Sequence, residues 1–272
     1  MMQYLAEMLS YPFMTRALVG GVLLSLCAAL LGVSLVLKRY SMIGDGLSHV
    51  GFGALAVASA LNLAPLAVAI PVVVVAAFFL LRLSRSGKMR GDAATAVFST
   101  GALAVGVMVV SLSTGMNADL NSYLFGSILA MSKEDVRLSA AVCVIVLLIY
   151  VICYDKIFAV TFDEDFAKAT GTRTERYNSL LAVLTAIIVV LGMRMMGALL
   201  ISSLIVFPAL TSMRLLKSYR GVMICSVVFA VISFTLGVGF SFLYATPTGA
   251  SIVVVDVILF VIASLISWIK ER

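Results

Sequence analysis

The chain has 272 residues, of which 62% are hydrophobic and only 12% are charged, with a formal net charge of +6 at pH 7. Soluble domains average about 25% charged residues, so the composition excludes an ordinary soluble protein. Apolar runs of about twenty residues recur along the chain, and each is long enough to cross a ~30 Å hydrocarbon core as a helix. Because the alternation of a membrane barrel is absent, we expect an all-α polytopic membrane protein with a single domain over residues 1–272.

The apolar runs predict nine transmembrane helices, with eight as the alternative count. The predicted spans are residues 15–37, 46–61, 64–82, 92–113, 138–154, 179–193, 196–213, 221–244 and 250–269. The start of the chain, "MMQYLAEMLSYPF", has no basic segment before a short apolar core, so we expect an amphipathic lead-in and no cleavable signal peptide.

The basic residues between the runs predict the orientation. With the N-terminus outside and the C-terminus in the cytoplasm, fifteen Lys and Arg residues face inward, and only Arg16, Lys133, Arg137 and Arg194 face outward. Cytoplasmic loops of membrane proteins carry such an excess of basic residues. Membrane orientation therefore explains the positive charge, and no nucleic-acid partner is expected.

The second run begins with "SMIGDGLSHVGFG", which holds the only histidine of the chain, His49, four residues after Asp45. This spacing places both side chains on one helical face, and a carboxylate with an imidazole suits Zn²⁺, Mn²⁺ or Fe²⁺. Two ligands bind a metal weakly, but a symmetric dimer supplies two aspartates and two histidines. The alternative, which the residues alone favour, is that His49 only forms a hydrogen bond near the inner interface.

Two connections are long enough to have a function of their own. The outer one, 114–137, includes an apolar piece, 123–131, that is too short to cross the membrane and predicts a half-helix. The inner one, 160–177, carries "FDEDFAKATGTRTERYN", which predicts a short polar helix followed by a turn at Gly171. It is either a docking surface for a soluble partner or a solvated loop, and composition alone favours the loop.

Two further acidic residues lie at or within predicted spans. Asp92 follows the basic run "RSGKMR" and Gly91, so we expect it to cap the next helix at the surface. Asp256 lies six residues into the last span, where a carboxylate is costly. It faces an aqueous cavity, pairs with a basic group or stays protonated, and the sequence assigns it no role.

Missing motifs argue against an enzyme. There is no G-x-x-x-x-G-K-[ST] motif, so the chain does not hydrolyse ATP itself, and no H-E-x-x-H motif of zinc proteases. "MIGDG" matches only part of the signature of intramembrane aspartyl proteases, because Met42 stands at the first glycine position. We expect no catalytic residue and no permanently bound cofactor.

Five segments in order carry a resemblance to a known family. They are "PFMTRALVGGVLLSLCAALLGVSLVLKRYSMIGDGLSH", "DLNSYLFGSILAMSKEDV", "DEDFAKATGTRTERYN", "MGALLISSLIVFPALTSMRLLK" and "YATPTGASIVVV". Together they resemble the integral-membrane permease subunits of bacterial ABC importers for zinc and manganese. The sequence departs from many relatives in having "VGFGA" after His49, where they have a run that contains proline.

The resemblance implies an ABC-importer permease fold in the bacterial plasma membrane. It implies a second permease chain, cytoplasmic ABC ATPase subunits that dock on 160–177, and an extracytoplasmic metal-binding protein that docks on the outer loops. It also places a transport site on the aspartate and histidine that are Asp45 and His49 here, with Zn²⁺ or Mn²⁺ as the substrate. For Asp45 and His49, the resemblance therefore favours a metal site over a simple hydrogen bond. For 160–177, it favours a docking surface over a solvated loop.

The resemblance leaves the cargo open. "DLNSYLFGSILA" is closer to the zinc branch of the family, which favours zinc, and a manganese or iron(II) importer is the alternative within it. An importer of cobalamin-like or siderophore-like chelates resembles this plan but usually has a longer chain. A stand-alone ion-coupled metal carrier is the alternative outside the ABC class, and it would not need the charged segment 160–177.

Overall fold

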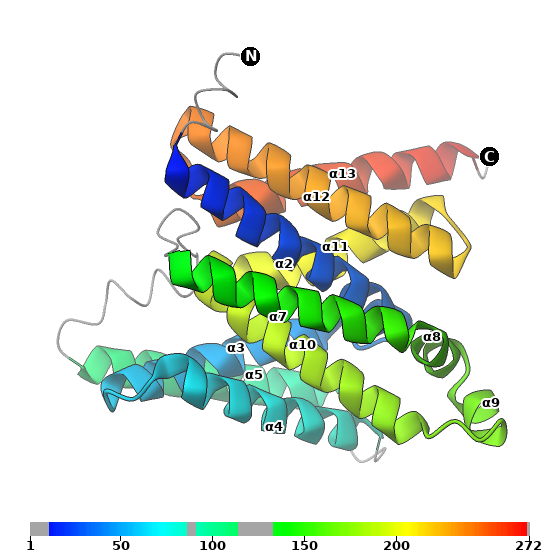
Figure 1. The fold of residues 1–272 in the computed structure, drawn as a ribbon, viewed down its shortest axis with the longest axis horizontal. Coiled ribbons are helices and arrows are strands. Elements are labelled where there is room, and N and C mark those ends of the chain that lie inside the picture. Colours follow the sequence, from blue (N-terminus) through cyan, green and yellow to red (C-terminus); the bar gives the residue numbers. More distant parts are fainter. Residues whose placement is uncertain (1–10, 86–90, 114–132, 271–272) are drawn as a thin grey trace.

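A computed structural model describes residues 11–85, 91–113 and 133–270, and these residues form eleven helices and no strands (Figure 1). The helices are α2 (Pro12–Leu37), α3 (Ser41–Ala60), α4 (Pro65–Arg85), α5 (Gly91–Leu112), α7 (Lys133–Ile152), α8 (Tyr154–Phe162), α9 (Glu164–Ala169), α10 (Thr174–Met196), α11 (Ala198–Leu215), α12 (Tyr219–Tyr244) and α13 (Thr248–Lys270). Each predicted span corresponds to one of the nine long helices, so the all-α prediction is confirmed.

Among the described residues, seven helices are long and apolar enough to cross a membrane. An eighth candidate is the broken pair of Val136–Ile152 and Tyr154–Phe162, which are bent by 68°. The ninth long helix, α3, has the length but not the hydropathy, because Asp45, His49 and several glycines interrupt its apolar residues. The candidates therefore number seven, or eight with the broken pair counted as one span, which is the lower predicted count, and including α3 as well gives nine.

The long helices run along one common direction, and successive helices point in opposite directions (Figure 1). As a result α2 begins at the left-hand end of the bundle in this view, whereas α13 ends at the right-hand end, the end at which α8 and α9 also lie. Opposite ends agree with termini on opposite sides of a membrane. That the right-hand end faces the cytoplasm stays a prediction from the basic residues.

Tight turns reverse the chain at the ends of α2, α3 and α9. Each turn holds one residue in the left-handed region, Arg39 (φ 62°), Asn62 (φ 54°) and Gly171 (φ 80°) respectively. After α2, the Tyr40 N–H donates to the Leu35 carbonyl at 2.8 Å, which is the hydrogen bond of a Schellman motif. The start of α3 is therefore tied directly to the end of α2.

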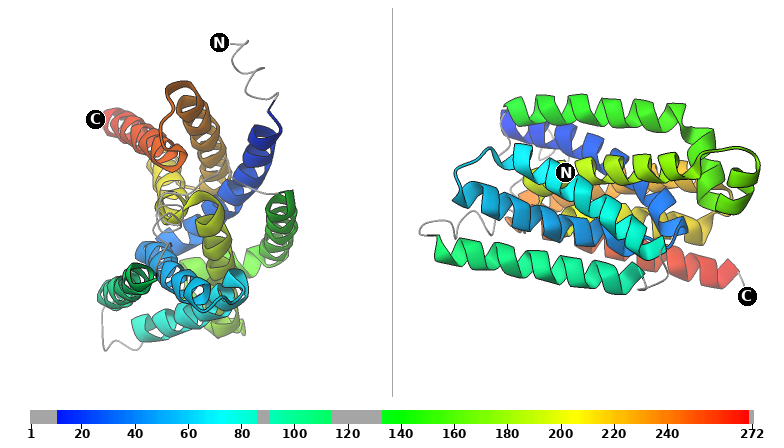
Figure 2. Two further views of the ribbon diagram at one scale, coloured as in Figure 1. Left: turned by 90° about the vertical axis from the view of Figure 1, so that its left-hand side faces the viewer. Right: turned by 90° about the horizontal axis from the view of Figure 1, so that it is seen from below.

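The helices form two groups joined through α10 and α11. In one group α2 packs against α7, α11 and α12, and in the other α3 packs against α4 and α5, with α10 and α11 touching both (Figure 2). A close backbone approach in the first group is at Gly32 of α2, where a Cβ atom would overlap the carbonyl oxygen of Ile205 on α11. The backbones of α2 and α11 therefore meet without a side chain between them.

Two predictions concern segments outside the described residues. The half-helix expected at 123–131 lies there, and of the outer connection 114–137 only residue 133 onward is described, as the start of α7. Most of the lead-in expected at the N-terminus also lies there, since α2 begins at Pro12.

We predict that Gly32→Ala destabilises the bundle by about 2 kcal/mol or more, since overpacking against an immobile backbone carbonyl forces the helices apart. The measurement is the Tm of the purified chain in a mild detergent. Gly101→Ala on α5 is the matched control, because nothing lies within 4 Å of its added Cβ. It should leave the Tm unchanged or raise it slightly, and an equal loss in both variants would contradict the packing at Gly32.

Candidate metal site

Glycines of α3 let the neighbouring helices pack closely against most of its surface. A Cβ atom on Gly51 would lie 2.7 Å from Cε of Met193 on α10, and one on Gly53 would lie 2.6 Å from the carbonyl oxygen of Ala102 on α5. A Cβ atom on Gly46 would overlap the side chain of Thr95, also on α5. Small residues let backbones approach closely within membranes, and here they bury most of an unusually polar helix.

The part of α3 that stays open is a strip formed by Met42, Asp45 and His49. The Met42 residue is 50% exposed, and the side chains of Asp45 and His49 are 43% and 23% exposed. The Asp45 Oδ2 and His49 Nε2 atoms are 3.7 Å apart. The structure thus brings the two predicted site residues together on one face, as their spacing indicates.

The second nitrogen of His49 has no partner of its own. Among the described residues, Nδ1 is buried and makes no hydrogen bond, which is costly for a polar atom. One position away, the Ser48 hydroxyl donates to the Asp45 carbonyl at 2.7 Å and lies 3.4 Å from the hydroxyl of Ser202 on α11. The turn that carries the pair is thereby held against α11.

One chain does not complete a metal site. In the described ranges no group of three or more His, Cys, Asp or Glu side chains could hold a metal ion. Asp45 and His49 therefore offer two ligands, whereas a zinc site takes four ligands, usually at least three of them from protein. The remaining ligands have to come from water or from a second chain.

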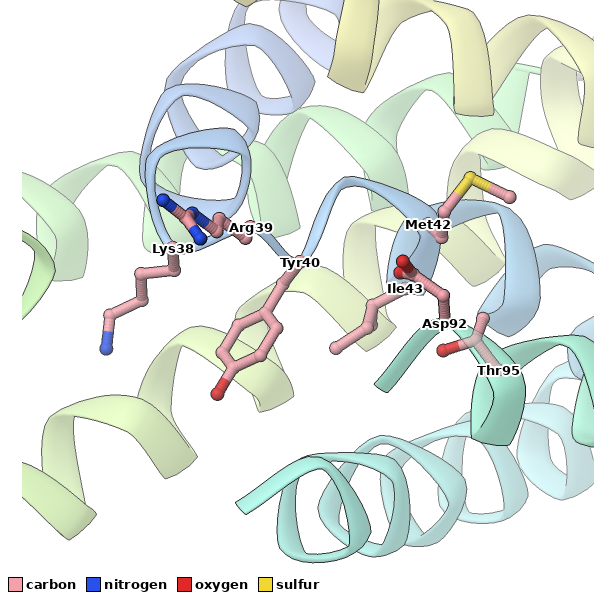
Figure 3. Close-up of a pocket in the computed structure, with 7 residues that line it drawn as sticks. All are labelled: Lys38, Arg39, Tyr40, Met42, Ile43, Asp92 and Thr95. Carbon is pink, nitrogen blue, oxygen red and sulfur yellow. The ribbon is translucent and has the colours of Figure 1, made fainter. Parts of the chain in front are cut away.

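A polar pocket of about 140 Å³ lies at the start of α3, next to this strip (Figure 3). Its lining includes Lys38, Arg39 and Met42, together with Asp92 from α5. Asp92 is in the first turn of α5 and is exposed, in agreement with the predicted surface position. Sequence reasoning missed its position beside Met42, because that proximity depends on the packing of α5 against α3 and no local pattern signals it.

Asp256 lies elsewhere, between α11, α12 and α13. It is only 2% exposed, and its Oδ2 accepts a hydrogen bond from Ser203 of α11 at 3.4 Å, with Ser233 of α12 as a second hydroxyl partner. No basic side chain of the described residues forms an ion pair with it. Of the three expected alternatives, the pairing with a basic group is wrong, and hydroxyl groups surround the carboxyl instead.

The predicted helix of the inner connection is confirmed. It is α9, in which the Asp163 carboxylate caps the start by accepting from the Phe166 N–H at 2.9 Å, and Gly171 forms the turn that follows. The Phe166 side chain is exposed, with a relative accessibility of 65%.

A cluster of polar side chains joins α9 to the end of α2. The Lys38 side chain is 8% exposed, and its Nζ lies 3.5 Å from Glu164 Oε2. The same ammonium group donates to Asn178 Oδ1 on α10, and Asn178 Nδ2 donates to Glu164 Oε2 at 3.2 Å. Sequence reasoning did not identify this cluster, because its three members are far apart in the chain.

Comparisons with known proteins agree on one family. The profile of the ABC-3 family, described as the ABC 3 transport family, matches residues 10–267. The chain is 29% identical over 258 residues to the manganese transport system membrane protein MntC of Halalkalibacterium halodurans, covering 94% of this chain and 88% of that protein. It is 28% identical to the high-affinity zinc uptake system membrane protein ZnuB of Haemophilus influenzae, covering 93% and 97% of the two chains.

A solved structure has the same fold along the chain. PsaBC from Streptococcus pneumoniae, in complex with Fab, superposes with a TM-score of 0.86 at 26% identity, covering 96% of this chain and 94% of that one.

We predict that Asp256→Asn keeps the stability of the wild type, because an amide oxygen accepts the same hydroxyl hydrogen bonds as the carboxyl. Asp256→Lys should lower the Tm of the purified chain strongly, since it buries an unpaired cation among hydroxyls. Thermal unfolding in detergent measures both. A large loss of stability in the asparagine variant would mean that a charged carboxylate is needed at this position.

Proposed function

The chain belongs to the ABC 3 transport family, and from this membership we propose that the metal it carries is zinc and that Asp45 and His49 bind the ion during transport. The chain is the membrane-spanning permease subunit of a bacterial metal ABC importer, and thus a multi-pass membrane protein and a transporter rather than an enzyme. A stand-alone ion-coupled carrier does not fit such a subunit.

The observation that carries the proposed site is the open strip of α3. Asp45 and His49 are 3.7 Å apart and partly exposed on a helix whose other faces are mostly buried, and polar groups in membrane spans are costly and usually functional. Two copies of the chain related by a twofold axis would bring two such strips face to face. Their two carboxylates and two imidazoles then supply four ligands.

A zinc cargo is supported by the ligand chemistry. Imidazole is a preferred ligand of zinc, whereas manganese prefers carboxylate, carbonyl and water oxygens. A shared set with two imidazoles among four ligands therefore suits tetrahedral zinc. The likeness of "DLNSYLFGSILA" to the zinc branch agrees with this, and the named relatives include both a zinc and a manganese system. Manganese or iron(II) is the alternative cargo.

A site shared by two chains also suits alternating access. In the proposed cycle a metal-binding protein docks on the outer loops, including 114–137, and the ion enters between the two permease chains. Each chain holds only half of the ligands, so a relative motion of the chains lowers the coordination number. The ion is then released inward instead of being trapped in a closed site.

The energy for that motion comes, in this proposal, from separate ATPase subunits that dock on 160–177. Phe166 and the charged surface of α9 form the contact. Movement of α9 passes through Glu164 to Lys38, and the turn at Arg39 and Tyr40 connects Lys38 to α3. The Lys38 cluster therefore links the docking helix to the helix that holds the metal ligands.

We predict that Asp45→Ala and His49→Ala each lower metal uptake by at least tenfold, the order of loss seen when metal-site residues are changed. Uptake of radiolabelled zinc and manganese is measured in proteoliposomes that contain the permease, its ATPase and its binding protein. The wild type should take up zinc in preference to manganese.

Met42→Leu is the control, because Met42 lies on the same strip and offers no hard ligand. It should transport at the wild-type rate. Full uptake in either alanine variant would overturn the site, whereas preferential manganese uptake by the wild type would overturn only the choice of metal.

We predict that Lys38→Met lowers metal uptake by about tenfold while the ATPase stays bound and active, because breaking a largely buried ion pair costs about 3 kcal/mol. Lys168→Met is the matched control. Lys168 also pairs with Glu164, at 3.5 Å, but its side chain is 54% exposed, and such pairs contribute about 0–1 kcal/mol. Uptake and ATP hydrolysis are measured together in the reconstituted complex.

Lys38→Arg keeps the positive charge and should restore part of the lost uptake. If Lys38→Met and Lys168→Met behave alike, or if Lys38→Met releases the ATPase, the cluster does not transmit the motion.

A further inference from the structure

An apolar groove with a volume of about 590 Å³ lies on the face formed by α2, α7 and α12. Its floor is on α2, which lies between α7 and α12 in Figure 1, and α8 closes the end near the inner connection. The volume is in the range of pockets that hold small molecules. The apolar lining residues are Leu30, Val151, Met223, Ile224, Val227 and Val228.

Several of these side chains are exposed in the chain itself, including Val151 (66%), Ile224 (68%) and Val228 (49%). In a membrane-spanning bundle such a surface faces acyl chains. The groove begins at the first turn of α12, at Arg220, and extends along two further turns to Val228. It therefore runs from the end of the bundle into the hydrocarbon region, as the chain of a phospholipid does.

Two opposite charges line the end of the groove, Arg220 from α12 and Asp155 from α8. The Arg220 guanidinium lies 5.9 Å from the centre of the Tyr154 ring, which holds it at the groove. Within the described residues Asp155 and Arg220 form no ion pair with one another or with other side chains. The groove thus offers one cationic and one anionic group at the position of a lipid headgroup.

The groove lies on a different side of the bundle from the metal strip. The strip on α3 is flanked by α5 and α11, which contact Gly46 and Gly44 respectively, whereas the groove is bounded by α2, α7 and α12 (Figure 2). A second permease chain that meets the metal strip therefore leaves the groove open to the bilayer.

We propose that this groove binds one phospholipid with a zwitterionic headgroup that carries a primary ammonium, of the phosphatidylethanolamine type. Its acyl chain lies against Val227 and Val228, its phosphate pairs with Arg220, and its ammonium donates hydrogen bonds to Asp155. The predicted orientation places this lipid in the cytoplasmic leaflet.

The two charges select the headgroup. Phosphatidylglycerol presents a phosphate to Arg220 but no cation to Asp155. Phosphatidylcholine has the same net charge as phosphatidylethanolamine, but its quaternary ammonium has no N–H to donate. Binding should therefore be strongest for phosphatidylethanolamine, with phosphatidylglycerol and phosphatidylcholine both weaker.

Native mass spectrometry of the full chain in mild detergent, with each of the three lipids added in turn, tests the proposal. One phosphatidylethanolamine should stay bound at the highest collision energies. Asp155→Asn should lower the ratio of bound phosphatidylethanolamine to bound phosphatidylglycerol about fivefold, the effect of losing one exposed ion pair. Arg220→Gln should weaken the binding of both phosphatidylethanolamine and phosphatidylglycerol. Lys217→Gln, which changes a basic residue outside the groove, should alter neither.

Val228→Trp fills the groove and should remove the retained lipid without lowering the Tm of the chain. The proposal is overturned if this variant keeps the lipid, if Asp155→Asn leaves the ratio of the two lipids unchanged, or if phosphatidylcholine binds as well as phosphatidylethanolamine. Loss of a dimer in Val228→Trp would instead assign the groove to a second copy of the chain, and would equally overturn it.

Discussion

The enclosure of α3 is the constraint on which the rest of the structure depends. A helix with an aspartate and a histidine is costly in hydrocarbon, by about 2.5–3.5 kcal/mol for an aspartate at the centre of a span, so it has to be surrounded by protein. Gly46, Gly51 and Gly53 allow α5 and α10 to approach its backbone. What remains open is one strip, and the polar pair lies on it because the other faces are filled.

The buried helix α3 is also connected directly to the end of α2. Only three residues separate the end of α2 from the helix that holds Asp45, and they form a turn in which Arg39 adopts a left-handed conformation. A displacement of Lys38 is therefore passed to α3 through only two further residues, Arg39 and Tyr40. The proposed lipid groove lies on the far side of α2, toward α7 and α12.

Local patterns predicted much of the fold. The nine long helices followed from apolar runs, the shared face of Asp45 and His49 followed from their spacing, and the helix α9 followed from its polar residues and Gly171. These features depend on residues within one or two turns of each other.

Contacts between distant segments were not predictable in this way. The contact of Lys38 with Glu164 joins residues that no periodicity relates, and the hydroxyl partner of Asp256, Ser203, is on another helix. The position of Asp92 beside Met42 likewise requires the packing of α5 on α3. The remaining ligands of the proposed metal site, whether from water or from a second chain, are likewise given by no local pattern in the sequence.

The 68° bend between α7 and α8 has a consequence for the surrounding bilayer. The apolar part of α7, Val136–Ile152, spans about 25 Å at 1.5 Å per residue, whereas the hydrocarbon core is ~30 Å thick. Because α8 turns away instead of continuing across, the shortfall is met by thinning of the bilayer beside α7 or by charged side chains at the start of α7 reaching the headgroups, at a cost of a fraction of a kcal/mol per Å of mismatch. Membrane thickness therefore bears on the bend that leads toward α9.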